Sequence, residues 1–142
     1  MKKMLAFILV ITLILAFSGC AAKDLKKDIF NLVEKNYDAI LKACEEKDEE
    51  TLLSMNGITQ VNIVDGYVLV FCKGAGIAMS SQDYGFYYSE ENMPVGVSCS
   101  LEIVCDSDTM KPMNNGYEGT VAHNAFYTEQ IKGNIYFYSN AY

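Results

Sequence analysis

The chain has 142 residues, of which 18 are Asp or Glu and 11 are basic, all of them Lys, so its formal net charge is −7. This acidity argues against nucleic acid as a partner and against electrostatic docking on anionic lipid. The length, with 51% hydrophobic residues, is sufficient for one domain with a single modest core.

The start of the chain has the layout of a secretory signal peptide. Lys2 and Lys3 form a basic head, residues 4–17 are almost all apolar, and the small residues Ser18-Gly19 precede Cys20. The apolar run is shorter than the roughly 20 residues that a membrane-spanning helix needs. An uncleaved transmembrane anchor and a signal peptide cut at another site are the alternatives.

Residues 17–20, Phe-Ser-Gly-Cys, resemble the lipobox of bacterial lipoproteins, with Phe17 standing where that family usually carries Leu. The resemblance implies that the Cys20 thiol is diacylated and that Cys20 becomes the mature N-terminus. Two acyl chains hold a protein stably in a bilayer. We therefore expect a lipid-anchored protein at the cell membrane, facing outside the cytoplasm. Residues 1–19 would be the signal peptide, 20–24 a lipidated spacer and 25–142 a single domain.

One long amphipathic helix is predicted over residues 23–50. Its apolar side chains recur at spacings of three and four, and neither Pro nor Gly interrupts the run. The charged residues 45–50 could break this helix near residues 46–48. Asp48 would then cap a short second helix through Ser54, with Asn56-Gly57 as its stop.

Strand-like patterns follow, separated by turn signals. Asp65-Gly66 predicts a two-residue hairpin turn, and Lys132-Gly133-Asn134 predicts a second one near the end of the chain. Residues 73–76, Lys-Gly-Ala-Gly, lack the full pattern of a phosphate-binding loop and are expected to form a flexible loop. The predicted strands cover residues 59–64, 67–72, 84–89, 95–104, 125–131 and 135–142.

This order of elements predicts an α+β fold. One long N-terminal helix would pack on an antiparallel sheet of about five or six strands.

Aromatic side chains concentrate in the predicted strands. A Tyr-rich face could bind a partner, because Tyr offers apolar area together with a hydroxyl group. Tyr also fits half-buried strands, so packing is the alternative. The candidate binding residues are Tyr84, Tyr87, Tyr88, Tyr127, Tyr136 and Tyr138.

Four cysteines follow Cys20, at positions 44, 72, 99 and 105. An even number in an exported domain suggests disulfides, and Cys99 with Cys105 would close the shortest loop. Small buried free thiols are the alternative.

No catalytic constellation is evident. The single histidine, His123, could serve Cys99, Cys105 or Ser100 as a base, but nothing in the sequence links them. We therefore expect no catalytic residue, metal site or cofactor.

The body of the chain is similar to small, functionally uncharacterised lipoproteins of Gram-positive bacteria, through Tyr-rich segments such as residues 84–89 and 136–138. That resemblance implies no activity. The leading hypothesis is a non-enzymatic lipoprotein that binds a protein or peptide at the cell envelope, with an inhibitor or immunity-like role as a variant. The alternative is a small-ligand carrier with an aromatic pocket between helix and sheet.

Overall fold

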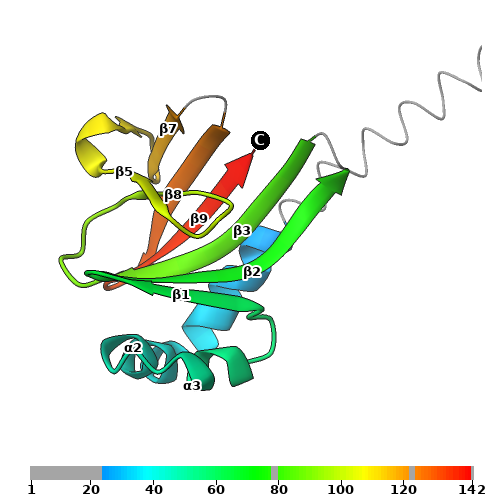
Figure 1. Cartoon of the computed structure of the whole chain (residues 1–142), viewed down its shortest axis with the longest axis vertical. Helices are drawn as coiled ribbons and strands as arrows, with labels where there is room; N and C mark the ends of the chain where they lie inside the picture. The colour runs from blue at the N-terminus through cyan, green and yellow to red at the C-terminus, as the bar shows by residue number, and fades with distance from the viewer. Residues whose placement is uncertain (1–23, 78–79, 122–123, 142) are drawn as a thin grey trace, which may run out of the picture.

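A seven-stranded antiparallel sheet dominates the computed structural model, which describes residues 24–77, 80–121 and 124–141 (Figure 1). The expected fold, one long helix on five or six strands, is therefore wrong: the sheet is larger and the helices are short. In spatial order the strands are β1 (Gln60–Val64), β2 (Tyr67–Ile77), β3 (Ser80–Ser89), β9 (Ile135–Ala141), β8 (Asn124–Lys132), β7 (Tyr117–Val121) and β6 (Lys111–Pro112).

The long N-terminal helix is replaced by three short ones, over residues 24–35, α2 (Tyr37–Glu45) and α3 (Glu49–Ser54). At Asn36 the backbone leaves helical geometry, with φ −117° and ψ 20°. The Asn36 side-chain amide donates to the Leu32 carbonyl at 2.8 Å, which is how Asn competes with helical hydrogen bonding. Figure 1 shows that the chain changes direction here, so α2 covers a different part of the sheet.

The helix break expected near residues 46–48 is present, with Lys47 at φ 55°. Asp48 caps α3, as predicted: its carboxylate accepts from the Thr51 hydroxyl at 2.6 Å and from the Thr51 backbone N–H at 3.0 Å. These two bonds, the hydroxyl bond first, lower the pKa of Asp48. The first backbone N–H groups of a helix have no acceptor within the helix, and Asp48 supplies one for the Thr51 N–H of this six-residue helix.

Both predicted hairpin turns are confirmed. Gly66 (φ 73°) lies between β1 and β2, where Val64 pairs with Tyr67, and Gly133 (φ 53°) lies between β8 and β9. Positive φ suits glycine, which has no Cβ to clash. In contrast, the loop expected at residues 73–76 is wrong, because β2 continues through it and pairs with β3 as far as Ile77 and Ser80.

The single strand expected over residues 95–104 is also wrong. The chain turns back on itself and forms a two-stranded sheet from β4 (Gly96–Val97) and β5 (Ile103–Cys105), followed by the 3₁₀ turn η1 (Ser107–Thr109). The reversal is closed by a hydrogen bond from the Ser98 N–H to the Glu102 carbonyl at 2.9 Å. We call residues 90–105 the crossover segment, since it connects β3 with the second half of the sheet.

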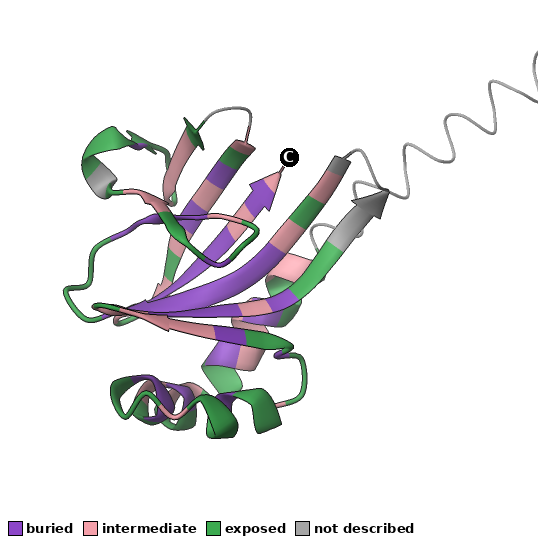
Figure 2. Ribbon diagram, in the orientation of Figure 1, coloured by how far each residue is buried: buried purple, intermediate pink, exposed green. Residues whose placement is uncertain are grey.

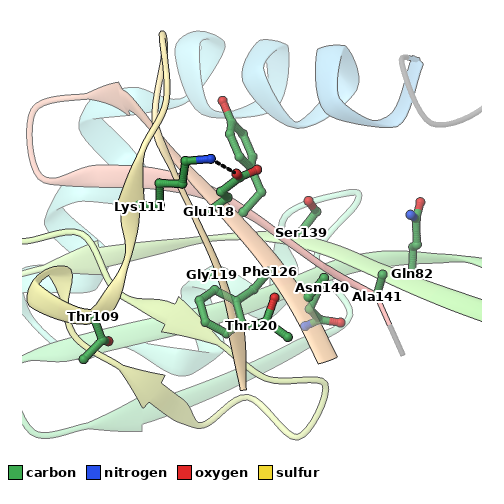
Figure 3. Close-up of a pocket in the computed structure, with 12 residues that line it drawn as sticks. Gln82, Thr109, Lys111, Glu118, Gly119, Thr120, Phe126, Ser139, Asn140 and Ala141 are labelled. Atoms are coloured by element: carbon green, nitrogen blue, oxygen red, sulfur yellow. Dashed lines mark ion pairs between the residues drawn. The ribbon is translucent and has the colours of Figure 1, made fainter. Parts of the chain in front are cut away.

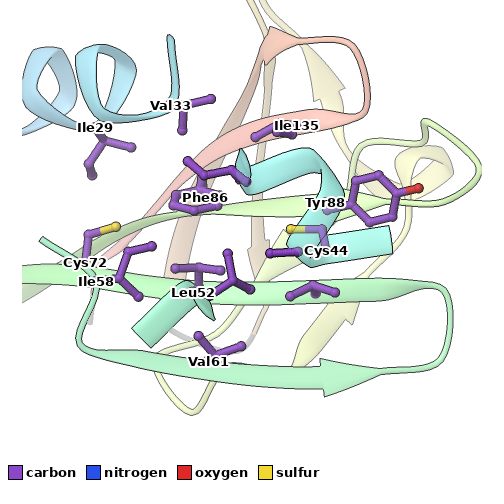
Figure 4. Packing of buried hydrophobic residues seen from close by; sticks show 14 of the residues in the cluster. Ile29, Val33, Cys44, Leu52, Ile58, Val61, Cys72, Phe86, Tyr88 and Ile135 are labelled. Carbon is purple, nitrogen blue, oxygen red and sulfur yellow. The ribbon is translucent and has the colours of Figure 1, made fainter. Parts of the chain in front are cut away.

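The two faces of the sheet carry separate cores. On one face, helix residues such as Ile29 and Val33 form one core with Phe86 and Ile135 (Figure 4). On the other face, the crossover segment places Val95, Val97 and Leu101 over residues of β2, β3 and β9. Strands β3 and β9 are therefore buried along much of their length (Figure 2).

Within the described part of the chain, no helix is both long and apolar enough to cross a membrane.

Candidate functional site

Five of the six candidate binding tyrosines lie in the cores, with at most 7% of each residue exposed. Tyr84 and Tyr88 belong to the helix-side core, and Tyr87, Tyr136 and Tyr138 belong to the core under the crossover segment. These five side chains therefore do not form an exposed recognition face. The physical reason is that both faces of the sheet are covered here. Successive side chains of a strand point to opposite faces, so each of these tyrosines points into one of the two cores.

The Tyr87 hydroxyl is the centre of a buried hydrogen-bond chain. It accepts from the Val95 N–H at 2.9 Å and lies 2.7 Å from the Thr128 hydroxyl, which in turn donates to the Phe137 carbonyl at 3.0 Å. The ring of Tyr87 stacks on that of Tyr136 with centroids 5.2 Å apart. Tyr87 thus ties the crossover segment to three strands.

Two further side chains of β9 hold the same segment. The Tyr136 hydroxyl lies 2.9 Å from both the backbone and the side-chain oxygen of Asn92, and the Asn140 amide donates to the Val97 carbonyl at 3.1 Å. Two of the candidate tyrosines, Tyr87 and Tyr136, therefore have a structural role in attaching residues 92–97 to the sheet.

The candidate site is an open hollow of about 540 Å³ at one end of the sheet, which we call the sheet groove (Figure 3). Strand register places one row of its residues side by side across four strands: Gln82, Ala141, Ala125 and Thr120. The adjacent row contains Ser139, Tyr127, Glu118 and Lys111. Residues that pair across two strands point to the same face of the sheet. Tyr84 of the helix-side core pairs with Ser139 of the second row, so this row lies on the helix side of the sheet.

The lining combines small and polar groups. Ala125, Ser139 and Ala141 leave space above the strands, and Lys111 and Glu118 form an ion pair of 3.5 Å beside them (Figure 3). The Lys111 side chain is largely exposed and the Glu118 side chain is partly exposed, so this pair contributes little to stability and is available to other partners.

Tyr127, the remaining candidate tyrosine, lines this groove and is half-buried. Its hydroxyl donates to Glu129 at 2.7 Å, and burial, followed by that carboxylate, raises the pKa of Tyr127. Glu129 also pairs with Lys26, whose ammonium lies 5.3 Å from the centre of the Tyr127 ring. These contacts fix the helix of residues 24–35, the N-terminal helix of the structure, against one wall of the groove.

The remaining hollows differ in size and enclosure. A second open hollow of about 560 Å³ lies between residues 92–94 and 112–117, whereas a small one of about 90 Å³ lies under the crossover segment. The buried Asn140 side chain lines the small hollow, and its Oδ1 has no hydrogen-bond partner among the described residues. Between the helices and the sheet, Phe86 and Phe137 are packed in the core.

All four described cysteines are free thiols. The Cys99–Cys105 disulfide suggested by the sequence is thus not formed in this structure: Cys105 pairs with Gly96 across the two-stranded sheet, and Cys99 is exposed in the turn between its strands. Burial raises the pKa of both Cys44 and Cys72 to about 12.

This difference in burial predicts selective alkylation. At pH 8 iodoacetamide is expected to modify Cys99 first and Cys105 more slowly, while Cys44 and Cys72 stay unmodified until denaturant is added, because the reactive species is the thiolate. Peptide mass mapping gives the extent of modification at each position. Labelling of Cys44 at the rate of Cys99 in the folded protein would contradict the packing described.

Two residues named from the sequence, Cys20 and His123, lie outside the described residues. Within the described ranges, no group of three or more His, Cys, Asp or Glu side chains is arranged to hold a metal ion.

The groove could not be recognised from the sequence. Its small residues belong to different strands, and only the pairing of β9 with β3 and β8 brings them together.

No protein-family model, curated protein or solved structure matches this chain.

Proposed function

We propose that this chain is a lipid-anchored protein outside the cytoplasm that binds a protein or peptide of the cell envelope in the sheet groove. The basic head, apolar run and Ser18-Gly19-Cys20 junction support the location, with diacylated Cys20 as the anchor. The observation that carries the binding role is the shape of the groove, which is open and extends across β3, β9, β8 and β7.

The chemistry of the groove favours a polypeptide over a small ligand. Small-molecule sites are concave, mostly apolar and nearly enclosed. This groove is open, and charged and hydroxyl side chains such as Lys111, Glu118 and Thr120 contribute to its lining. The aromatic pocket between helix and sheet that a carrier would need is taken up by packed core residues, including Phe86 and Phe137.

Site-specific photocrosslinking on intact cells tests this proposal. A photoreactive amino acid replaces Thr120, an exposed groove residue, in the full-length chain, and it replaces Glu49 on the exposed surface of α3 as the matched control. We expect one dominant envelope protein or peptide to be attached from position 120 and not from position 49. Mass spectrometry of the adduct identifies it.

A charge-reversed variant adds a test of the groove itself. In Lys111→Glu two carboxylates face each other and the groove loses the cation of its lining, so a partner that pairs with Lys111 is held less tightly and the crosslink from position 120 is expected to weaken. Exchanging both charges, Lys111→Glu with Glu118→Lys, restores the ion pair and shows whether its orientation matters. Identical adducts from positions 120 and 49, or none from either, would contradict the proposed binding role. An intact mass of the membrane-extracted protein that shows no lipid adduct on Cys20 would contradict the anchor alone.

A further inference from the structure

The outer edge of β2 has no neighbouring strand, among those described, along residues 73–77, the second part of the strand. β1 pairs with β2 only as far as Gln60 and Phe71, and the preceding Thr59 N–H donates to the Phe71 carbonyl at 3.0 Å. β2 then continues over residues 73–77 and pairs on its inner side with β3. Among the described strands none pairs with the outer side of residues 73–77, as Figure 1 shows for the far end of β2.

Over residues 73–77, the described part of the chain gives this edge neither a Pro nor a covering strand. Proteins protect open edges with Pro, with Lys and other charged side chains, with bulges, with inward-pointing charges or with a covering segment. Residues 73–77 read Lys-Gly-Ala-Gly-Ile, so Lys73 is the only charge and two of the five residues have no side chain. The register shift lies before this run, between Phe71 and Lys73, and from Lys73 to Ile77 the pairing with β3 is regular.

A hollow of about 240 Å³ lies at the start of the same edge. The N-terminal helix contributes Leu25, Ile29 and Leu32 to it, and β2 contributes Cys72 and Lys73. Asp28, Asn56 and Gly57 complete the lining. The hollow therefore has an apolar interior and one cationic and one anionic side chain in its lining, and it adjoins the main-chain groups of the open edge.

We propose that the outer edge of β2 binds an extended segment of another protein as an additional strand, with one apolar side chain of that segment in this hollow. In such strand addition, main-chain hydrogen bonds supply affinity and a pocket for an alternate side chain supplies specificity. The bound segment carries an apolar residue that enters the hollow. The residues beside it are polar, because Lys73 and Asp28 lie in the lining of the hollow. This inference does not rest on the sheet groove, which lies across β3, β9, β8 and β7.

Selection of peptides against the full-length chain in detergent micelles tests the inference. Random nine-residue peptides displayed on phage are enriched, and the tightest are synthesised with backbone N-methyl groups on every second residue, in both alternate sets. One set is expected to weaken binding at least about tenfold, because its methyl groups replace the amides that face β2, while the other set has little effect. Replacing the apolar residue by Ser is expected to weaken binding similarly.

Two protein variants separate this site from the groove. Ala75→Pro and Gly74→Pro each remove one backbone donor, and because neighbouring amides face opposite sides, one of the two removes an outward donor. That variant is expected to remain folded and lose the peptide, whereas Lys111→Glu in the groove is expected to bind it normally. Absence of enriched peptides, equal tolerance of both N-methylated sets, or loss of binding in Lys111→Glu would overturn the proposal. Edge pairing only between two copies of this chain, seen as a dimer without peptide, would overturn it as well.

Discussion

Gly85→Ala is expected to destabilise the protein by about 3 kcal/mol or more, toward the upper limit for overpacked cores. A Cβ at this position of β3 would lie 2.0 Å from the Val70 carbonyl oxygen and 2.6 Å from the Tyr138 ring. Neither neighbour can move freely, because Val70 belongs to β2 and Tyr138 is a fully buried residue of the central strand. Chemical denaturation followed by circular dichroism measures the change in the free energy of unfolding.

The matched control is Gly66→Ala in the β1–β2 turn. Gly66 has φ 73°, and beyond its chain neighbours no atom lies within 4 Å of the place that the new methyl group would occupy, so the substitution carries backbone strain without a clash. Its expected cost is about 1 kcal/mol. Equal effects of the two substitutions would show that the close approach of Tyr138 to Gly85 is not a constraint on the fold.

Tyr87→Phe is expected to cost about 2 to 3 kcal/mol, although it removes a single oxygen atom. Without the hydroxyl, the buried Val95 N–H loses its acceptor and Thr128 loses a partner. Tyr87 and Thr128 are fully buried, so water cannot easily replace the missing group. The amide of Val95 is expected to exchange with deuterium much faster in the variant, because the crossover segment is released locally before the sheet unfolds.

Tyr136→Phe is the natural comparison, since it also removes a hydroxyl group that holds the crossover segment. Its acceptor, Asn92, is exposed, so water can replace the lost hydrogen bonds and the expected cost is below about 1 kcal/mol. A larger effect for Tyr136→Phe than for Tyr87→Phe would contradict the assignment of Tyr87 as the main attachment of this segment.

Local signals in the sequence were sufficient for the two tight hairpins and the cap of α3. Gly66 and Gly133 adopt the positive φ that their turns require, and Asp48 makes the capping bonds that its position suggested. In each case the deciding interaction lies within a few residues of the chain, so the pattern and the structure depend on the same physics.

The errors arose where distant segments decide the conformation. Gly74 and Gly76 have low strand propensity, yet their segment is a strand because β3 pairs with it. Asn36 interrupts a run that hydrophobic spacing alone describes as continuous. The burial of Tyr87 and Tyr136 depends on the crossover segment lying over the second face, a tertiary arrangement that strand alternation cannot reveal. The groove was missed for the same reason, because its alanines in β8 and β9 become neighbours only through strand pairing.

The position of β9 has a consequence for how the molecule is assembled. It is the last of the described strands along the chain, but it lies in the middle of the seven-stranded sheet, with β3 on one side and β8 on the other. The ladder that joins the first three strands to β6, β7 and β8 therefore does not exist until residues 135–141 have been delivered. The described strands are made first from one edge inward, β1 to β3, and then from the opposite edge inward, β6 to β8, so two incomplete half-sheets exist until β9 pairs with both.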